Sequence, residues 1–379
     1  MTIIYHLQKF ILRRFFPFKD WISDLRNPKI LRADIVAGLT VALVLVPQSM
    51  AYAQLAGLPP YYGLYASFLP VAIASIFGSS RQLATGPVAV VSLLTAAALE
   101  PIASNDPTGY VAYAIMLAFL VGIFQLSLGL LRMGVLVDFL SHPVVTGFTN
   151  AAAIIIATSQ LSKLFGVTAV SGEHHYQTVI NVISEALINT HSPTLLMGVL
   201  AIFLILLSRK ISSKYPAVLI SVVITTVISW YIQFEVNYGG KVIGVVPDGL
   251  PTIQMPQIDF DQLVNLGTVA IAISLIGFME AISIAKAMAT QTKQRLDADQ
   301  ELIGQGLSNI VSSFFQGYPV SGSFSRSAVN ISAGAVTGFS SVVTGIVVGI
   351  TLLFLTPLLY HLPQATLAAV IITAVINLI

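Results

Sequence analysis

The chain has 379 residues, of which 56% are hydrophobic and only 9% are charged, and its net charge is +2. Soluble globular domains have about a quarter of their residues charged, so this composition excludes an ordinary soluble fold and predicts an all-α polytopic membrane protein. The absence of cysteine excludes disulfides and thiolate metal sites, and the small net charge does not indicate a nucleic-acid partner.

Residues 1–33 form a basic and aromatic segment before the first apolar run. The stretch YHLQKFILRRFFPFKDWI interleaves phenylalanine and tryptophan with lysine and arginine, and no small-residue cleavage site follows a short apolar core. This pattern predicts a cytoplasmic amphipathic segment on the membrane surface rather than a cleaved signal peptide. A basic tail without regular structure is the alternative.

Twelve apolar segments then follow with the composition of membrane helices. They cover residues 34–54, 61–79, 87–100, 109–131, 142–165, 194–208, 217–233, 267–289, 299–316, 323–334, 338–358 and 364–379. A full crossing of the bilayer needs about 20 residues, so several of these segments can span it. The segments 87–100 and 323–334 are too short to do so.

The positions of lysine and arginine predict the direction of the spans. With the N-terminus in the cytoplasm and alternating crossings, 15 of the 18 basic residues lie on the cytoplasmic side. Only Lys163 and Lys241 lie outside, and Arg326 falls within a span. We therefore expect a multi-pass protein of the cell membrane with a cytoplasmic N-terminus and polar outer segments at 166–193 and 234–266.

Each short segment follows a stretch that disfavours helix, ATGPV at 84–88 and QGYPVSGS at 316–323. Alternation of the spans makes the first short helix run outward from the membrane centre and the second run inward from it. Two discontinuous helices of opposite direction are typical of an inverted repeat. Two ordinary helices kinked by Gly-Pro are the alternative.

These breaks occur third in each half of the chain, which predicts the domain organisation. The first repeat, with spans 1 to 7, would cover residues 34–235, and an extracellular connector would cover 236–266. The second repeat would cover 267–379, with spans 8 to 12. A repeat of seven spans leaves this second half two spans short.

Two helix N-termini that face each other form a site for an anion, because their amides are unpaired and carry a partial positive charge. Gly86 and Gly322 would let the backbone approach a ligand closely. Arg326 follows the second break, and its guanidinium suits an oxyanion. Arginine at the bilayer centre costs about 2.5–3.5 kcal/mol, which a wet cavity and a bound anion would offset. An ion pair with Glu280 and snorkelling to the inner surface are the alternatives.

Glu280 lies near the middle of the segment 267–289. An acid inside the membrane is a functional hypothesis by default. A low dielectric favours the neutral form, so Glu280 could take up a proton near neutral pH, or it could hold Na⁺ when ionised. Either property would couple H⁺ or Na⁺ to anion uptake. A carboxylate that only neutralises Arg326 is the alternative.

Five segments in order carry a family resemblance. They are VPQSMAYAQLAGLPPYYGLYASFLP at 46–70, GSSRQLATGPVAVVSL at 78–93, VDFLSHPVVTGFTNAAAIIIATSQL at 137–161, ELIGQGLSNIVSSFFQGYPVSGSFSRSAVN at 301–330 and LPQATLAAVII at 362–372. They resemble the SulP anion permeases, which include the sulfate permeases and animal solute carrier family 26. The resemblance covers nearly the whole chain from about residue 30.

The resemblance implies a seven-plus-seven transmembrane inverted repeat with core and gate domains, and an anion between spans 1, 3, 8 and 10. Gln48 and Tyr52 match the substrate contacts of span 1, whereas Val88 matches a position that is often phenylalanine. Glu280 matches the acid of proton-coupled, plant-type sulfate transporters. The predicted substrate site comprises Gln48, Tyr52, Gly86, Val88, Gly322, Ser323, Phe324, Ser325 and Arg326, with Glu280 as the cation-coupling residue.

The chain departs from the family pattern at its end. The family has fourteen spans followed by a cytoplasmic STAS domain, whereas this chain stops at Ile379 in the twelfth predicted span. We therefore expect a second repeat that is truncated, with the missing spans belonging to the gate.

The leading functional hypothesis is a secondary active transporter of a small inorganic oxyanion, with sulfate preferred, coupled to H⁺ or Na⁺ and working by alternating access. A bicarbonate or chloride transporter or exchanger, or a passive anion channel of the same family, is the alternative. Arg326 argues against a nucleobase permease, and a sensor or scaffold that does not transport is the remaining possibility. No phosphate loop, H-E-x-x-H or G-x-S-x-G motif is present, so we expect no enzyme.

Two further patterns are weak. His174 and His175 are adjacent and cannot share one helix face, so we predict a solvated outer loop and neither a metal site nor an organic cofactor. Gly345 and Gly349 form a GxxxG pattern, which permits close helix packing in a homodimer. A small anion, membrane lipid and a second copy of the chain are therefore the expected partners.

Overall fold

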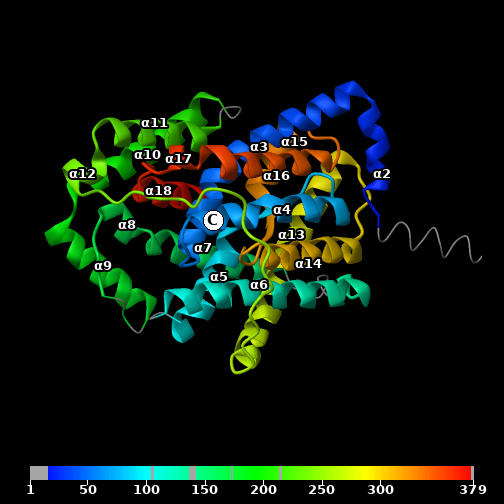
Figure 1. Cartoon of the computed structure of the whole chain (residues 1–379), viewed down its shortest axis with the longest axis horizontal. Helices are drawn as coiled ribbons and strands as arrows, with labels where there is room; N and C mark the ends of the chain where they lie inside the picture. Colours follow the sequence, from blue (N-terminus) through cyan, green and yellow to red (C-terminus); the bar gives the residue numbers. More distant parts are fainter. Residues whose placement is uncertain are drawn as a thin grey trace, which may run out of the picture.

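The computed structural model describes residues 16–103, 106–135, 142–170, 172, 174–212 and 216–376. Figure 1 shows an almost entirely helical chain with one short pair of strands. The elements are α2 (Lys19–Ile22), η1 (Ser23–Arg26), α3 (Pro28–Leu55), α4 (Tyr61–Phe77), β1 (Ala84–Gly86), α5 (Ala89–Ala103), α6 (Pro107–Leu130), α7 (His142–Ser159), α8 (Leu161–Phe165), α9 (His175–Asn189), α10 (Ser192–Ile211), α11 (Ala217–Tyr231), α12 (Phe234–Tyr238), α13 (Leu263–Thr292), α14 (Ala298–Phe314), β2 (Ser321–Ser323), α15 (Phe324–Ser332), α16 (Phe339–Ile350), η3 (Thr351–Leu355), α17 (Thr356–Leu359) and α18 (Gln364–Val375).

All twelve predicted apolar segments are helical over most of their length. Among the described residues, five helices are long and apolar enough to cross a membrane, namely Pro28–Leu55, Pro107–Leu130, Ser192–Ile211, Leu263–Thr292 and Phe339–Leu359. Shorter apolar helices lie between them, including Tyr61–Phe77, Ala217–Tyr231 and Gln364–Val375. The chain is therefore a multi-pass, all-α membrane protein.

The first long helix begins earlier than predicted, at Pro28 rather than at residue 34. Asn27 explains the start, because its side chain accepts a hydrogen bond from the amide of Lys29 at 3.0 Å and proline occupies the first helical turn. Only the later part of the predicted surface segment can be compared, since residues 1–15 lie outside the described residues. In that part, Trp21 is buried.

One group of helices, here called the core group, contains α3, α4, α6, α13, α14 and α16. Glycine residues let α6 and α14, the most closely packed pair of this group, approach each other. A Cβ atom at Gly122 of α6 would lie 2.6 Å from the amide nitrogen of Ile310, and one at Gly306 of α14 would lie 2.5 Å from that of Leu126. The two backbones therefore touch, which is how helices pack where lipid removes the hydrophobic driving force.

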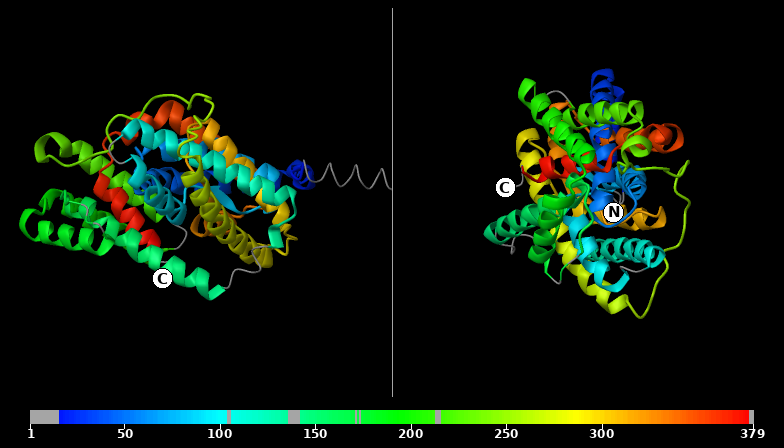
Figure 2. Two further views of the ribbon diagram at one scale, coloured as in Figure 1. Left: turned by 90° about the horizontal axis from the view of Figure 1, so that it is seen from below. Right: turned by 90° about the vertical axis from the view of Figure 1, so that its left-hand side faces the viewer.

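A second group, here called the gate group, contains α8, α10, α11 and α18. Figures 1 and 2 show this group at one end of the molecule, with α13 and α14 toward the other. Ser221 of α11 donates a hydrogen bond to the carbonyl of Ala201 in α10 at 3.0 Å. Thr366 of α18 likewise contacts Thr225 of α11 at 3.1 Å. Hydrogen bonds from buried hydroxyls thus join the three helices.

The segment between the two repeats is an extended strap that contacts both groups. The carbonyl of Lys241 accepts a hydrogen bond from the amide of Gln364 in α18 of the gate group at 3.0 Å, and Asp259 accepts one from Tyr113 of α6 at 2.8 Å. Figure 1 shows the strap running from α12 across the bundle to α13. The segment follows the short helix α12 and leads into α13.

The two predicted helix breaks meet in an antiparallel pair of strands. Ala84 pairs with Ser323, Thr85 with Gly322 and Gly86 with Ser321, and all six residues are buried. β1 leads into α5 and β2 leads into α15, so both helices start at this ladder. This confirms the discontinuous helices, and it excludes ordinary helices kinked by proline.

One expectation about the outer segments is wrong. The solvated outer loop predicted around His174 and His175 is instead the start of the helix α9. Its start is stabilised by Gln177, whose side chain accepts a hydrogen bond from the backbone amide of His174 at 3.1 Å. Among the described residues, no group of three potential metal ligands occurs, and His175 contacts Thr158 at 2.8 Å.

Candidate functional site

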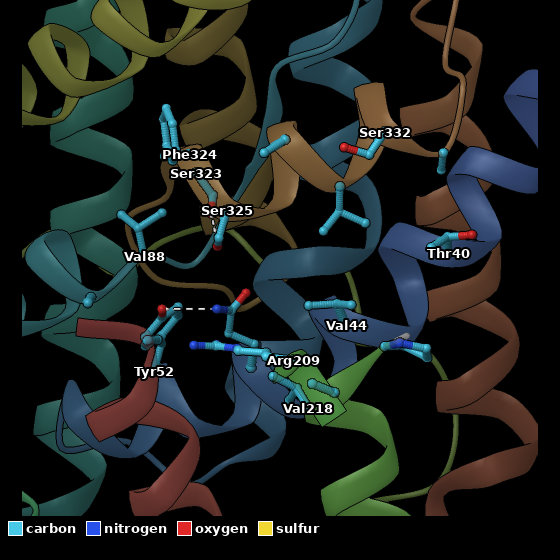
Figure 3. Close-up of a pocket in the computed structure, with 18 of the residues that line it drawn as sticks. Thr40, Val44, Tyr52, Val88, Arg209, Val218, Ser323, Phe324, Ser325 and Ser332 are labelled. Atoms are coloured by element: carbon cyan, nitrogen blue, oxygen red, sulfur yellow. Dashed lines mark hydrogen bonds between the residues drawn. The ribbon is translucent and has the colours of Figure 1, made fainter. Parts of the chain in front are cut away.

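A cavity of about 720 Å³ lies between the core group and the gate group. Its core-side wall comes from α3, from α13, from the whole length of α15 and from the residues after β1. Its gate-side wall comes from the end of α10 and the start of α11. Figure 3 shows Val88, Tyr52 and Ser325 of the core-side wall, with Val218 of α11 from the gate-side wall below them.

Most of the predicted site residues share this cavity. Those that line it are Gln48, Tyr52, Val88, Glu280, Ser323, Phe324 and Ser325. Residues from four separate stretches of the chain are therefore brought together, because the β1–β2 ladder places the two broken helices beside α3 and α13. The other three predicted residues, Gly86, Gly322 and Arg326, lie behind the wall.

A hydrogen-bonded chain links the cavity to Arg326. The Nη1 atom of Arg326 donates to Oε1 of Gln48 at 3.1 Å, and Nε2 of Gln48 donates to the hydroxyl of Tyr52 at 3.2 Å. Gln48 and Tyr52 stand four residues apart on α3, so they share one helix face. Gln48 both accepts this hydrogen bond and lines the cavity. Its amide therefore lies between the guanidinium of Arg326 and the cavity.

Arg326 is fully buried, at 0% exposure. Its Nε and Nη2 atoms have no hydrogen-bond partner, and within the described residues no carboxylate oxygen lies within 4 Å of it. These observations exclude snorkelling and a direct ion pair with Glu280. Oε2 of Glu280 is also buried without a partner. Buried polar atoms are nearly always paired in proteins, so these three atoms have hydrogen-bonding capacity that no other side chain of the described residues uses.

The two glycines have packing roles that differ from the expected close approach to a ligand. A Cβ atom at Gly86 would lie 3.3 Å from Nη2 of Arg326, so this glycine makes room for the guanidinium. A Cβ atom at Gly322 would lie 2.8 Å from Leu83 and 3.1 Å from Ala281 of α13. Gly322 therefore seats the ladder against α13, and neither glycine lines the cavity.

Comparison with known proteins decides the family. A model of the sulfate permease family matches residues 31–379. The chain belongs to this family. The match confirms the resemblance inferred from five short segments of the sequence.

Curated relatives of the family are similar over nearly the whole chain. The chloroplastic sulfate transporter 4.1 of Arabidopsis thaliana is 41% identical, over 96% of this chain and 54% of the relative. The sodium-independent sulfate anion transporter of Bos taurus is 35% identical, over 97% of this chain and 65% of the relative. The chain thus spans about half the length of the first of these permeases.

Solved structures agree with the inverted-repeat fold. SLC26A9 matches with a TM-score of 0.91 and 26% identity, over 98% of this chain and 61% of that one. The transmembrane domain of the cyanobacterial transporter BicA matches with a TM-score of 0.82 and 24% identity, over 92% of this chain and 89% of that one. The second likeness concerns the fold alone.

Polar residues of α14, which were not among the predicted site residues, hold the ladder in place. Oε2 of Glu301 accepts hydrogen bonds from the amides of Ser79 and Ser80 at 2.9 and 2.8 Å. Nε2 of Gln305 donates to the hydroxyl of Thr85 in β1 at 2.9 Å. Asn309 completes the series by accepting from the amide and donating to the carbonyl of Val320, next to β2.

A signal for these residues was present in the sequence. Glu301, Gln305 and Asn309 recur every four residues, which places three polar side chains on one face of an apolar helix. Such a face needs buried partners, and the broken backbone next to the two half-helices supplies unpaired amides and carbonyls.

The gate-side residue Arg209 was also overlooked, because its position at a helix end placed it among the basic residues of the cytoplasmic side. The structure places Arg209 in the wall of the cavity. The sequence did not indicate this role, because a basic residue in the last turn of a helix stabilises the helix dipole whichever way its side chain points.

Proposed function

We propose that the protein is a secondary active transporter of a small inorganic oxyanion, with sulfate as the substrate. The named relatives from Arabidopsis thaliana and Bos taurus, which are sulfate transporters, support the choice of sulfate. The polar lining of the cavity supports binding of an anion, and no metal ion or organic cofactor is part of the proposal.

The observation that carries the proposal is the buried guanidinium of Arg326, with two nitrogen atoms that lack partners. A buried cation without compensation is strongly unfavourable, so an anion in the adjacent cavity would stabilise it. Gln48, Tyr52 and Ser325 would contact the anion, since each lines the cavity. Arg326 would act from behind Gln48 by adding its charge to the field.

The starts of α5 and α15 add to this field. Both helices begin at the ladder, and residues at or just before these starts, Val88 and Ser323, line the cavity. Helix N-termini carry roughly half a positive charge and unpaired amides, which favour an anion without any metal ion. The hydroxyl of Ser325 lies 3.4 Å from that of Ser323, so both can donate to one bound oxyanion.

Glu280 would couple a cation to this transport. It lines the same cavity, and its Oε2 atom is buried without a hydrogen-bond partner. A proton bound there would remove a negative charge that repels sulfate, so anion binding and proton binding would favour each other. Na⁺ held by the ionised carboxylate is the second form of the same coupling.

Transport would proceed by movement of the core group against the gate group. The cavity lies between the two groups and its lining comes from both, so a relative movement would open it alternately to each side. A structure of murine Slc26a9 in the inward-facing state has a TM-score of 0.90 with this chain, at 26% identity over 96% of this chain and 63% of that one. This likeness supports the inward-facing state for the present structure.

Placement in the cell is part of the proposal. The charge distribution supports a cytoplasmic N-terminus, and Arg81 and Asp24 form an ion pair at 3.3 Å, as residues on one side of the membrane can. We place the protein in the cell membrane, in contact with lipid, as a homodimer. The GxxxG glycines do not support the dimer, because Cβ atoms at Gly345 and Gly349 would meet Phe68 of the same chain at 2.6 and 2.8 Å.

The test is uptake of radiolabelled sulfate by the reconstituted full-length protein. We expect uptake that competes with unlabelled sulfate and that rises when a pH or Na⁺ gradient is imposed. If bicarbonate competes better than unlabelled sulfate, the bicarbonate transporter is favoured instead. If the rate of uptake does not depend on the pH gradient or the Na⁺ gradient, the passive channel or exchanger is favoured. No flux of any of these anions would contradict transport itself.

A further inference from the structure

Arg209 differs from the predicted site residues in one important respect. Among the described residues that line the cavity, the charged ones are Glu280 on the core side and Arg209 on the gate side. Arg326 is at 0% exposure and does not line the cavity. An anion that enters this cavity therefore meets the charge of Arg209 directly, whereas it meets that of Arg326 only through Gln48.

The side chain of Arg209 has hydrogen-bonding capacity to spare. It lies in the last turn of α10, and its Nη1 atom donates to the carbonyl of Thr373 at a long 3.3 Å. Within the described residues, no carboxylate oxygen lies within 4 Å of the guanidinium. Guanidinium has five N–H donors in a planar fork, which suits two oxygens of one oxyanion. The single weak contact orients the side chain and leaves other donors for a ligand.

The two arginines stand on different groups of helices. Arg209 belongs to α10 of the gate group, which packs against α11 and α18, whereas Arg326 belongs to α15, which packs against α3 of the core group. Figure 3 shows Arg209 close to Val218, another gate residue of the wall, with the start of α15 across the space. A movement of core against gate would therefore change the distance between the two cations.

We propose that Arg209 forms a second anion subsite, on the gate-side wall of the cavity, that binds an oxyanion entering from the cytoplasmic side. The inference rests on the proposed function and deepens it. Since the charge distribution places the end of α10 on the cytoplasmic side, the subsite serves that side alone. This subsite belongs to the gate group, whereas the site at Gln48 belongs to the core group and moves with it.

The neighbouring residue provides a matched control. Lys210 has the same charge, lies in the same last turn of α10 and does not line the cavity. Both residues contribute equally to the helix dipole and to the positive charge of the cytoplasmic side. Any difference between their neutral variants therefore reports the position of Arg209 in the cavity wall.

The experiment compares Arg209→Gln, Arg209→Lys and Lys210→Gln in inside-out and right-side-out membrane vesicles that contain the full-length protein. Radiolabelled sulfate is supplied at increasing concentration to each face, and the initial rate is recorded. We expect Arg209→Gln to raise the half-saturating sulfate concentration about threefold to tenfold from the cytoplasmic face only. The maximal rate, and the value from the outer face, should not change. Arg209→Lys should retain most of the affinity, and Lys210→Gln should behave as the wild type.

Ionic strength gives a second readout, because a solvent-accessible charge is screened by salt. The difference between wild type and Arg209→Gln should shrink as inert salt is raised from about 0.05 M to about 0.5 M. The inference is overturned if Arg209→Gln is unchanged, if it acts equally from both faces, or if Lys210→Gln has the same effect. Wild-type vesicles that move no sulfate would overturn the proposed function, and this inference with it.

Discussion

Gln48 and Arg326 are 278 residues apart in the chain, and Oε1 of Gln48 accepts a hydrogen bond from Nη1 of Arg326 at 3.1 Å. The contact joins a long helix of the first repeat to the half-helix of the second. It places a neutral amide between a buried cation and the cavity, so the amide controls how much of the charge a ligand experiences.

Two substitutions of Gln48 should have opposite effects on stability. Gln48→Leu removes the acceptor and leaves a further guanidinium nitrogen unpaired, which should destabilise the protein by about 1–3 kcal/mol and weaken sulfate binding. Gln48→Glu should preserve or raise the thermal stability by pairing with Arg326, yet it should lower sulfate affinity at least as much, because it neutralises the cation. Thermal unfolding and sulfate titration of the purified protein measure the two properties. Tight sulfate binding by Gln48→Glu would show that the charge of Arg326 is not needed.

Glu280→Gln should separate binding from coupling. The amide has the size of the protonated acid but cannot release a proton or hold Na⁺ by charge, so uptake driven by a pH or Na⁺ gradient should be lost while sulfate still binds. Glu100 of α5 is an exposed acid, and Glu100→Gln serves as the matched control. Uptake by Glu280→Gln that still responds to a gradient would assign the coupling to another group.

Gly86→Ala tests the space that the guanidinium occupies. The backbone of Gly86 has φ of +153°, and a Cβ atom there would lie 3.3 Å from Nη2 of Arg326 and 3.5 Å from Leu45. We expect a lower melting temperature and weaker sulfate binding, because the guanidinium must shift away from Gln48. Gly267 of α13 has no atom within 4 Å of the same position, so Gly267→Ala should leave binding unchanged and slightly stabilise the helix. Equal behaviour of the two variants would mean that Arg326 tolerates displacement.

Glu301→Ala tests the support beneath the ladder. The change leaves the amides of Ser79 and Ser80 without their acceptor, which should cost about 1–3 kcal/mol of stability. The loss should be local at first, so hydrogen exchange should accelerate over residues 79–86 before it does in α6. A uniform change in exchange across the bundle would indicate a general loss of packing instead.

Several features of the fold followed from composition and pattern alone. Twelve apolar segments, two of which follow a break, are visible in the sequence, because a membrane helix must be apolar along its length and a broken helix needs Gly or Pro at the break. Arg326 stands out for the same reason, since a charge within such a segment is rare. Local chemistry is sufficient for conclusions of this kind.

The sequence pattern did not predict which side chains contact one another. The sequence indicated that Arg326 faces an anion, whereas the structure places Gln48 between the arginine and the cavity. It marked Gly322 as an approach to a ligand, and the structure seats it against Ala281. Arg209 carried no signal, because its significance depends on which wall the end of α10 faces.

The sequence by itself determined the class of the protein, its twelve apolar segments and the two breaks, because these depend on how each segment meets lipid. Tertiary structure alone decided the pairing of Ala84 with Ser323 and the burial of Arg326 behind Gln48. These contacts join residues more than 200 positions apart, and their energies depend on three-dimensional distance, which neither hydropathy nor spacing along the chain encodes.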